Sequence, residues 1–150
     1  MRLINRRETL VLAGAAGAAF MLAPHAAFSA AGDAQALVTK FTGGKTASDG
    51  KVTLQMPEIA ENGNTVPLTV SIDSPMTKDN YVKRVLIVAE GNPRPEVATF
   101  NFSPMSGTAE ASTRMRLAKT QNVVAVAEMS DGSFHKVKRQ VKVTIGGCGG

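Results

Sequence analysis

The sequence has few of the residues on which most binding and catalytic sites are built. Of its 150 residues, one is cysteine, two are histidine, one is tyrosine and none is tryptophan. Without a second cysteine, no disulfide can form within the chain. The lysines and arginines are scattered and stacking aromatics are nearly missing, so the sequence does not support a nucleic-acid surface. The formal net charge of +5 allows at most a weak preference for anionic molecules or an acidic partner.

The first 31 residues have the composition of an export signal. Arg6 and Arg7 directly precede an apolar run over 10–22, which is followed by small residues. The run is short for a membrane span, which needs roughly 20 apolar residues, so an anchor or a buried helix is a weaker interpretation. The arginine pair is typical of twin-arginine export, although Thr9 departs from the usual pattern. We expect cleavage within 27–31 and a mature protein in the periplasm.

The remaining chain is long enough for one domain. It has about 120 residues, which suffice for a single hydrophobic core but not for two. Loss of the signal removes three arginines and one glutamate, so the formal net charge falls from +5 to +3. We see no repeat and no long linker in this part of the sequence.

A short helix followed by strands is predicted for this domain. Asp33 is a candidate N-cap, apolar residues recur at helical spacing as far as Phe41, and Gly43-Gly44 ends the helix. Turns are indicated at Asn62-Gly63-Asn64 and at Ser130-Asp131-Gly132, where the Asp-Gly pair favours a hairpin. Seven alternating apolar segments are expected to be strands: 51–56, 65–73, 81–90, 96–103, 112–118, 122–129 and 133–145.

Seven short strands with close turns favour an all-β fold. We predict an immunoglobulin-like antiparallel β-sandwich, although the disulfide and tryptophan of antibody domains are absent. Pro67 suggests that the strand at 65–73 lies at a sheet edge. Alternation places Val97 and Phe100 on opposite faces of their strand. In the last strand it turns Val137, Val141, Val143 and Ile145 inward and Lys136, Lys138 and Lys142 outward.

The only cysteine, Cys148, lies in the terminal sequence Gly-Gly-Cys-Gly-Gly at 146–150. The glycines offer no side chains to bury it, so the usual interpretation of a lone cysteine as a small core residue is disfavoured. An odd cysteine in an exported protein indicates intermolecular pairing or a reactive thiol. The tail supplies neither a base nor fixed oxyanion donors, which favours a handle for a bound group over a catalytic nucleophile. Five extended residues reach at most about 17 Å, which suits presentation of that group to other enzymes.

Other residues carry weaker signals. His135 is the only histidine outside the signal, and an exposed or hydrogen-bonded side chain is the favoured interpretation over a catalytic or metal role. The prolines around Arg94 indicate a rigid surface loop that could dock a partner. Thioethers bind Cu(I), but core packing and turn contacts explain the mature methionines better, namely Met56, Met76, Met105, Met115 and Met129.

The glycine-rich ending, the export signal and three internal segments resemble the SoxY family of sulfur carriers. These segments are ENGNTVPLTVSIDSPM, EGNPRPEVATF and LAKTQNVVAVAEMSDGSF. The resemblance implies that Cys148 is the covalent attachment residue in thiosulfate oxidation. It also implies a swinging carrier arm made by Gly146, Gly147, Gly149 and Gly150. No catalytic residue, metal ligand or cofactor of its own is expected.

The resemblance further implies a set of partner proteins. SoxZ, a second immunoglobulin-like protein, would form a heterodimer with this chain. The c-type cytochrome SoxAX would load thiosulfate as a cysteine S-thiosulfonate, and the dimanganese hydrolase SoxB would release sulfate from it. The molybdenum–haem sulfur dehydrogenase SoxCD would oxidise the remaining sulfane sulfur.

The expected organisation is therefore an export signal at 1–31, a sandwich domain at 32–145 and a carrier arm at 146–150. Two alternatives stay open. A thiol enzyme such as a sulfurtransferase or peroxidase would need a fixed base near Cys148, for which His135 is the sole histidine candidate. A structural domain could instead use Cys148 for covalent dimerisation.

Overall fold

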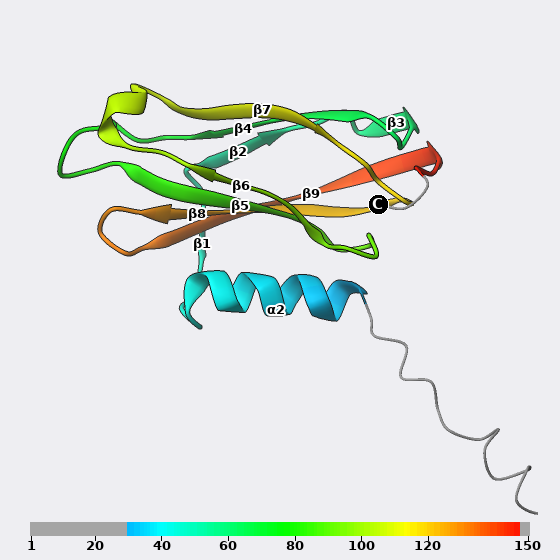
Figure 1. Cartoon of the computed structure of the whole chain (residues 1–150), viewed down its shortest axis with the longest axis horizontal. Helices are drawn as coiled ribbons and strands as arrows, with labels where there is room; N and C mark the ends of the chain where they lie inside the picture. The colour runs from blue at the N-terminus through cyan, green and yellow to red at the C-terminus, as the bar shows by residue number, and fades with distance from the viewer. Residues whose placement is uncertain (1–29, 148–150) are drawn as a thin grey trace, which may run out of the picture.

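The computed structural model describes residues 30–147, which form two β-sheets and a helix (Figure 1). One sheet has the strand order β1-β9-β8-β5-β6, with β3 also paired to β9, and the other has the order β2-β4-β7. The elements in chain order are α2 (Ala30–Thr42), β1 (Ser48–Asp49), β2 (Val52–Gln55), β3 (Ile59–Asn62), β4 (Val66–Ile72), β5 (Val82–Ala89), β6 (Glu96–Asn101), the 3₁₀ turn η2 (Pro104–Ser106), β7 (Ala109–Met115), β8 (Gln121–Met129) and β9 (Phe134–Ile145).

The predicted immunoglobulin-like sandwich is confirmed, and all seven predicted strands are present as β2 and β4 to β9. The short strands β1 and β3 were not predicted, because neither has an alternating apolar run long enough to stand out. Both pair with β9 in parallel, so the sandwich is antiparallel except at these two places.

The predicted helix is present, but it begins earlier than expected. α2 starts at Ala30, so Asp33 lies in its first turn and is not its N-cap. A carboxylate there still interacts favourably with the helix dipole. Gly43 ends the helix as predicted: its φ of 62° is in the left-handed region, and the N–H of Gly44 donates to the carbonyl oxygen of Thr39 at 3.0 Å.

The larger sheet is covered on both faces. The sheet of β2, β4 and β7 packs against one face, and α2 lies along the other (Figure 1). In β5 and β8 the side chains of both faces are consequently buried, including Leu86, Ile87, Val88 and Val126. This explains why these two strands have continuous apolar runs, since alternation is lost when neither face meets water.

Pro67 does not mark an edge strand. β4 is the middle strand of its sheet, between β2 and β7, so that prediction is wrong for the strand as a whole. Its partner β2, however, pairs only with residues 69–72 of β4, and Pro67 therefore has a neighbouring strand on one side alone. The missing N–H of proline is tolerated at such a position because no ladder bond is required there.

The predicted alternation also fails in β6. Val97 and Phe100 both pack against the core between the sheets, although simple alternation places them on opposite faces. The register of β6 against β5 shifts between Ile87 and Val88, which is a β-bulge or irregularity. A bulge adds one residue to one strand, and this reverses the facing of the residues beyond it.

The long strand β9 connects the two ends of the sandwich. It pairs with β8 through residues 134–141 and with β3 through residues 142–145. Val137, Val141 and Val143 face the core as predicted, but Ile145 is 66% exposed. The inward prediction for Ile145 is therefore wrong, because the sandwich core ends before the strand does.

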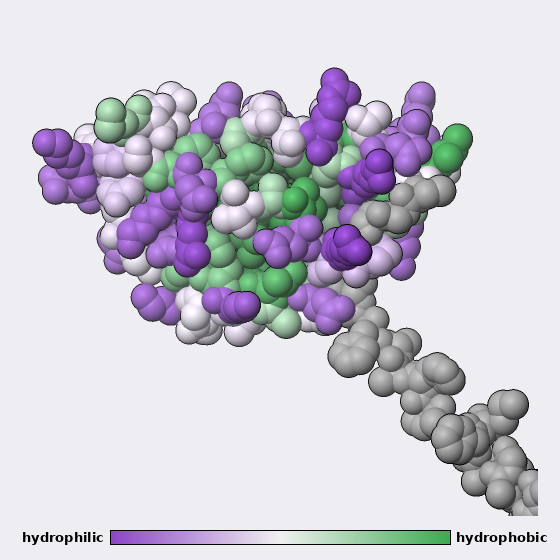
Figure 2. All heavy atoms as spheres, viewed as in Figure 1, coloured by the Kyte–Doolittle hydropathy of each residue, from purple (hydrophilic) through white to green (hydrophobic). Residues whose placement is uncertain are grey.

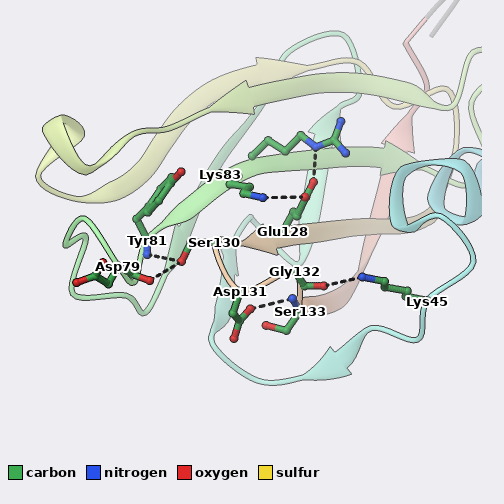
Figure 3. A network of polar contacts seen from close by, with 10 residues as sticks. Lys45, Asp79, Tyr81, Lys83, Glu128, Ser130, Asp131, Gly132 and Ser133 are labelled. Atoms are coloured by element: carbon green, nitrogen blue, oxygen red, sulfur yellow. Dashed lines mark hydrogen bonds and ion pairs between the residues drawn. The ribbon is translucent and has the colours of Figure 1, made fainter.

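The turn at the start of β9 is fixed by polar contacts (Figure 3). The hydroxyl of Ser130 accepts a hydrogen bond from the N–H of Tyr81 and donates to the carbonyl oxygen of Asp79, each at 3.1 Å. Gly132 has a φ of 79°, which fits the predicted Asp-Gly hairpin. Hydrogen bonds from the side chain and backbone of Ser133 lower the pKa of the exposed Asp131 carboxyl.

Apolar residues are visible along one side of the molecule (Figure 2). They lie in the middle of the view, with hydrophilic residues around them. The half-buried Val97, Phe100 and Phe102 of the β6 region pack on the core. Within residues 30–147, no helix has both the length and the hydropathy needed to cross a membrane.

Replacement of a central core residue should destabilise the domain strongly. Ile87 is fully buried between the sheets, so Ile87→Ala should lower the free energy of unfolding by about 2–5 kcal/mol. Ile59 is 60% exposed, and Ile59→Ala is the matched control, with a change of less than about 1 kcal/mol. Urea denaturation measures both. Equal losses in the two variants would contradict the assigned core.

Candidate functional site

The predicted carrier residues begin where β9 ends. Ile145 is the last residue of the strand, and Gly146 and Gly147 follow it as the last described residues. Cys148, Gly149 and Gly150 lie outside the described residues, and their predicted roles stay predictions. The site that the structure describes is therefore the root of the tail.

Three backbone hydrogen bonds hold the root of the tail. The N–H of Gly147 donates to the carbonyl oxygen of Leu117 at 2.9 Å, and the N–H of Leu117 donates to the carbonyl oxygen of Gly63 at 2.8 Å. The N–H of Gly63 donates in turn to the carbonyl oxygen of Ile145 at 2.7 Å. These bonds join the β3–β4 turn, the loop after β7 and the end of β9. We call this set of residues, Gly63, Leu117, Ile145 and Gly147, the tail junction.

The tail junction leaves no room for side chains on its glycines. A Cβ atom on Gly63 would lie 2.2 Å from the carbonyl oxygen of Leu117, and one on Gly147 would lie 2.7 Å from the carbonyl oxygen of Gly63. A Cβ atom on Gly146 would lie 2.2 Å from the carbonyl oxygen of Ala118. All three obstacles are backbone atoms, which cannot rotate away as the end of a side chain can. These glycines therefore permit close approach of three chain segments.

The close packing at the tail junction concerns two residues of the predicted carrier arm. We predicted that Gly146 and Gly147 belong to a flexible carrier arm, and that role stays a prediction. In the structure, however, Gly147 is buried and bonded to Leu117. The sequence shows only that side chains are absent, and this suits close packing as well as flexibility.

Buried polar side chains fix the loop that receives the tail. The Nδ2 atom of Asn92 donates to the carbonyl oxygen of Arg116 at 2.8 Å, while its Oδ1 atom accepts from the N–H of Ala118 at 3.0 Å. The same Oδ1 atom accepts from Nε2 of Gln121 at 2.7 Å, and Asn92 and Gln121 are both buried. Asn92 thus holds the residues on either side of Leu117. Because buried amides are costly to leave unpaired, this network stabilises one loop conformation.

A further bond joins the same loop to β9. The hydroxyl of Thr120 accepts a hydrogen bond from the N–H of Val143 at 2.9 Å. Sequence analysis missed the part that Gly63, Asn92 and Gln121 play at this site. The turn at Asn62-Gly63-Asn64 and the loop around Arg94 were predicted correctly, but nothing local in the sequence indicates which distant segment each of them contacts.

His135 lies far from the tail. It is the second residue of β9 and Ile145 is the last, so at about 3.3 Å per residue the two are roughly 33 Å apart along the strand. A base at that distance cannot take a proton from the thiol of Cys148. The Nδ1 atom of His135 is buried and has no hydrogen-bond partner within residues 30–147, so the favoured interpretation of an exposed or satisfied side chain is wrong for this atom.

Four of the five mature methionines take the structural roles that were favoured over copper binding. Met76, Met115 and Met129 are buried in the core between the sheets, Met56 packs against it and Met105 is exposed in η2. In the part of the chain that the structure describes, no group of three or more histidine, cysteine, aspartate or glutamate side chains is placed to hold a metal ion.

Arg94 lines a hollow against the helix. The hollow has a volume of about 720 Å³ and lies between α2 and the β5–β6 loop, with Leu37, Lys40, Pro93 and Pro95 also in its lining. The predicted docking role of this loop stays a prediction.

A charged pair anchors the start of the β5–β6 loop. The Nζ atom of Lys138 lies 2.7 Å from Oε1 of Glu90, and Nδ2 of Asn122 donates to Oε2 at 2.9 Å. Partial burial by itself raises the pKa of Glu90, but hydrogen bonds from Lys138 and Asn122 and the charge of Lys138 outweigh it. The pKa of this carboxyl is therefore lowered from its ordinary value of 4.5.

Comparison with known proteins identifies related chains. A family model described as sulfur oxidation protein SoxY matches residues 38–148. The chain is similar to the solved structure of the sulfur carrier protein SoxY from Chlorobium limicola f thiosulfatophilum, with 32% identity, a TM-score of 0.65 and coverage of 77% of this chain and 95% of that chain. A superoxide reductase (neelaredoxin) from Ignicoccus hospitalis shares the fold alone, with 15% identity, a TM-score of 0.56 and coverage of 63% and 80%. No curated protein matches the chain.

Loss of the Asn92 side chain should loosen the loop that receives the tail. Asn92→Ala leaves the N–H of Ala118 and the carbonyl oxygen of Arg116 without these partners, which should lower the free energy of unfolding by about 2–3 kcal/mol. Asn101→Ala, at an exposed position of β6, is the control and should change it by less than about 0.5 kcal/mol. If chemical denaturation gives the same small change for both, the network does not stabilise the loop.

The Glu90 carboxylate should make stability depend on pH. Because its pKa is lower in the folded state, its contribution is complete above the ordinary value of 4.5 and is lost as the pH falls through the lowered pKa. The stability difference between wild type and Glu90→Gln should therefore shrink on acidification from about pH 7 to about pH 3. Urea midpoints across this range measure the difference, with Glu110→Gln at an exposed site of β7 as the control. A difference that stays constant with pH would contradict the assignment.

Proposed function

The chain belongs to the SoxY family of sulfur oxidation proteins, and on that premise we propose that it holds sulfur intermediates covalently on Cys148 and presents them to partner enzymes. The observation that carries this proposal is that the family match extends to residue 148, the position of the only cysteine. The family supports a carrier role in sulfur oxidation. The attachment residue, the substrate and the partners are the proposed part.

Loading of thiosulfate is an oxidation. The thiol of Cys148 and thiosulfate together lose one proton and two electrons as a new sulfur–sulfur bond forms, which gives a cysteine S-thiosulfonate. A c-type cytochrome of the SoxAX kind is the proposed acceptor of the electrons. Water then cleaves the terminal sulfone as sulfate, with release of two protons, and leaves a persulfide anion on the carrier. SoxB is the proposed catalyst of this step, and SoxCD the proposed oxidant of the persulfide.

The described residues favour a carrier over an enzyme that acts by itself. A cysteine nucleophile is activated by a base within hydrogen-bond reach. The sole histidine candidate, His135, lies at the opposite end of β9, roughly 33 Å from the root of the tail. The chemistry is therefore assigned to partner enzymes, and the carrier supplies attachment and presentation.

The proposed setting is the periplasm, after removal of the export signal. There the chain would pair with SoxZ as a heterodimer and meet SoxAX, SoxB and SoxCD in turn. A SoxYZ pair of this kind should bury a stable, partly apolar interface.

Replacement of the thiol should abolish loading without affecting the fold. Cys148→Ser should gain no mass on incubation with thiosulfate and the cytochrome partner, whereas wild type gains a thiosulfate adduct on that residue. Intact-mass spectrometry measures the adduct, and the melting temperature should stay within about 1 °C because the substitution removes almost no apolar contact. An equal adduct on the serine variant would refute Cys148 as the attachment residue.

A further inference from the structure

We propose that Gly63 is a positioning residue for the carrier thiol, because it seats Gly147 in the tail junction and so fixes the point from which Cys148 is presented. This inference rests on the proposed carrier function and deepens it. It concerns where the free part of the tail begins.

The space around Gly63 explains why this residue must be glycine. Its φ is not among the left-handed values of the described glycines, so backbone conformation does not demand the missing side chain. A Cβ atom would instead lie 2.2 Å from the carbonyl oxygen of Leu117 and 2.8 Å from the nitrogen of Gly147. These are the two atoms that form the hydrogen bond of the tail root. A methyl group at position 63 would therefore push apart the contact that holds Gly147.

The loop that receives Gly147 is itself held in place. Leu117 is fully buried, and its N–H and carbonyl groups bond to Gly63 and Gly147 respectively. The residues on either side of it bond to Asn92, and the Thr120 hydroxyl bonds to the backbone of β9. Gly147 is thus bonded to a supported part of the domain.

A held Gly147 shortens the reach of the thiol. Consecutive Cα atoms lie about 3.8 Å apart, so the sulfur of Cys148 can lie no farther than roughly 7 Å from the Cα atom of Gly147. If the arm were free from Ile145 onward, three extended residues and the cysteine side chain would let the sulfur lie up to roughly 14 Å from the Cα atom of Ile145. A partner enzyme must therefore bring its reacting group close to the tail junction. The exposed Ile145 lies in the surface that such a partner would approach.

The first test measures the junction without any partner. Amide hydrogen exchange, followed by NMR on the full mature chain, should show the Gly147 amide protected in wild type. Gly63→Ala should reduce this protection at least about tenfold, while Gly32→Ala, at a helix glycine where an added Cβ atom would meet nothing within 4 Å, should leave it unchanged. Should Gly63→Ala fail to fold, Gly146→Ala tests the junction from the tail side, with Gly149→Ala as its control. Exchange of the wild-type Gly147 amide at the rate of an unstructured peptide would overturn the proposal.

The second test measures presentation of the thiol. Alkylation of Cys148 by a small soluble reagent should stay within about twofold of wild type in Gly63→Ala, since a small reagent reacts without docking on the junction. The kcat/KM of the cytochrome partner for thiosulfate loading should fall at least about tenfold, because a misplaced reacting group slows an oriented reaction. Gly32→Ala should load normally. If Gly63→Ala loses the protection of the Gly147 amide against hydrogen exchange but is still loaded at the normal rate, the positioning role is wrong.

The two proposals fail in different ways. If wild type gains no thiosulfate adduct, the carrier function fails, whereas the exchange data on Gly147 still report on the junction. If wild type is loaded normally and Gly63→Ala is loaded equally well, only the positioning role of Gly63 is lost.

Discussion

The structure of the tail junction depends on Leu117, whose side chain is fully buried while both of its backbone groups bond to other segments. Its N–H meets the turn between β3 and β4, and its carbonyl oxygen meets the last described residue of the tail. Three chain segments can approach so closely only where glycines stand at 63, 146 and 147. The buried amides of Asn92 and Gln121 support the loop from the other side, and buried polar networks of this kind specify one conformation when every member is paired.

The rest of the sandwich gives this region a firm base. β5 and β8 are covered by α2 on one face and by the smaller sheet on the other, so the centre of the domain is a three-layer core. β9 extends from this core to the tail and is bonded to β3 near its end. The end of β9 is thereby connected to the buried core. A sulfur carrier needs a rigid attachment point for its cargo. A group held on a mobile segment would rarely reach the orientation that an enzyme's active site requires.

The proposed division of labour between carrier and partner enzymes rests on the same geometry. A nucleophilic cysteine enzyme must keep a base and oxyanion donors within hydrogen-bond reach of its thiol. Among the described residues the one histidine is at the far end of β9, in the region of the fixed turn around Ser130 and Asp131. Its unpaired Nδ1 atom is a structural feature of that end and has no part in the proposed chemistry of Cys148.

Local patterns in the sequence were enough to predict the sandwich, the seven longer strands and the end of the helix at Gly43, whereas the role of Cys148 stays a prediction. Alternation and turn residues act over a few positions, so they report reliably on strands such as β4 and on the Asp-Gly turn. They failed at Val97, where a bulge in β6 changes the face of the sheet to which the side chain points. They failed at Ile145, because the core ends before β9 does. They also failed at Pro67, because the strand order of the sheet decides which strand is an edge. The short parallel strands β1 and β3 have no pattern of their own. Only the tertiary structure decided that Gly63, Leu117 and Gly147 meet. A glycine in the sequence shows that a side chain is absent, but it does not show which distant backbone segment fills the space.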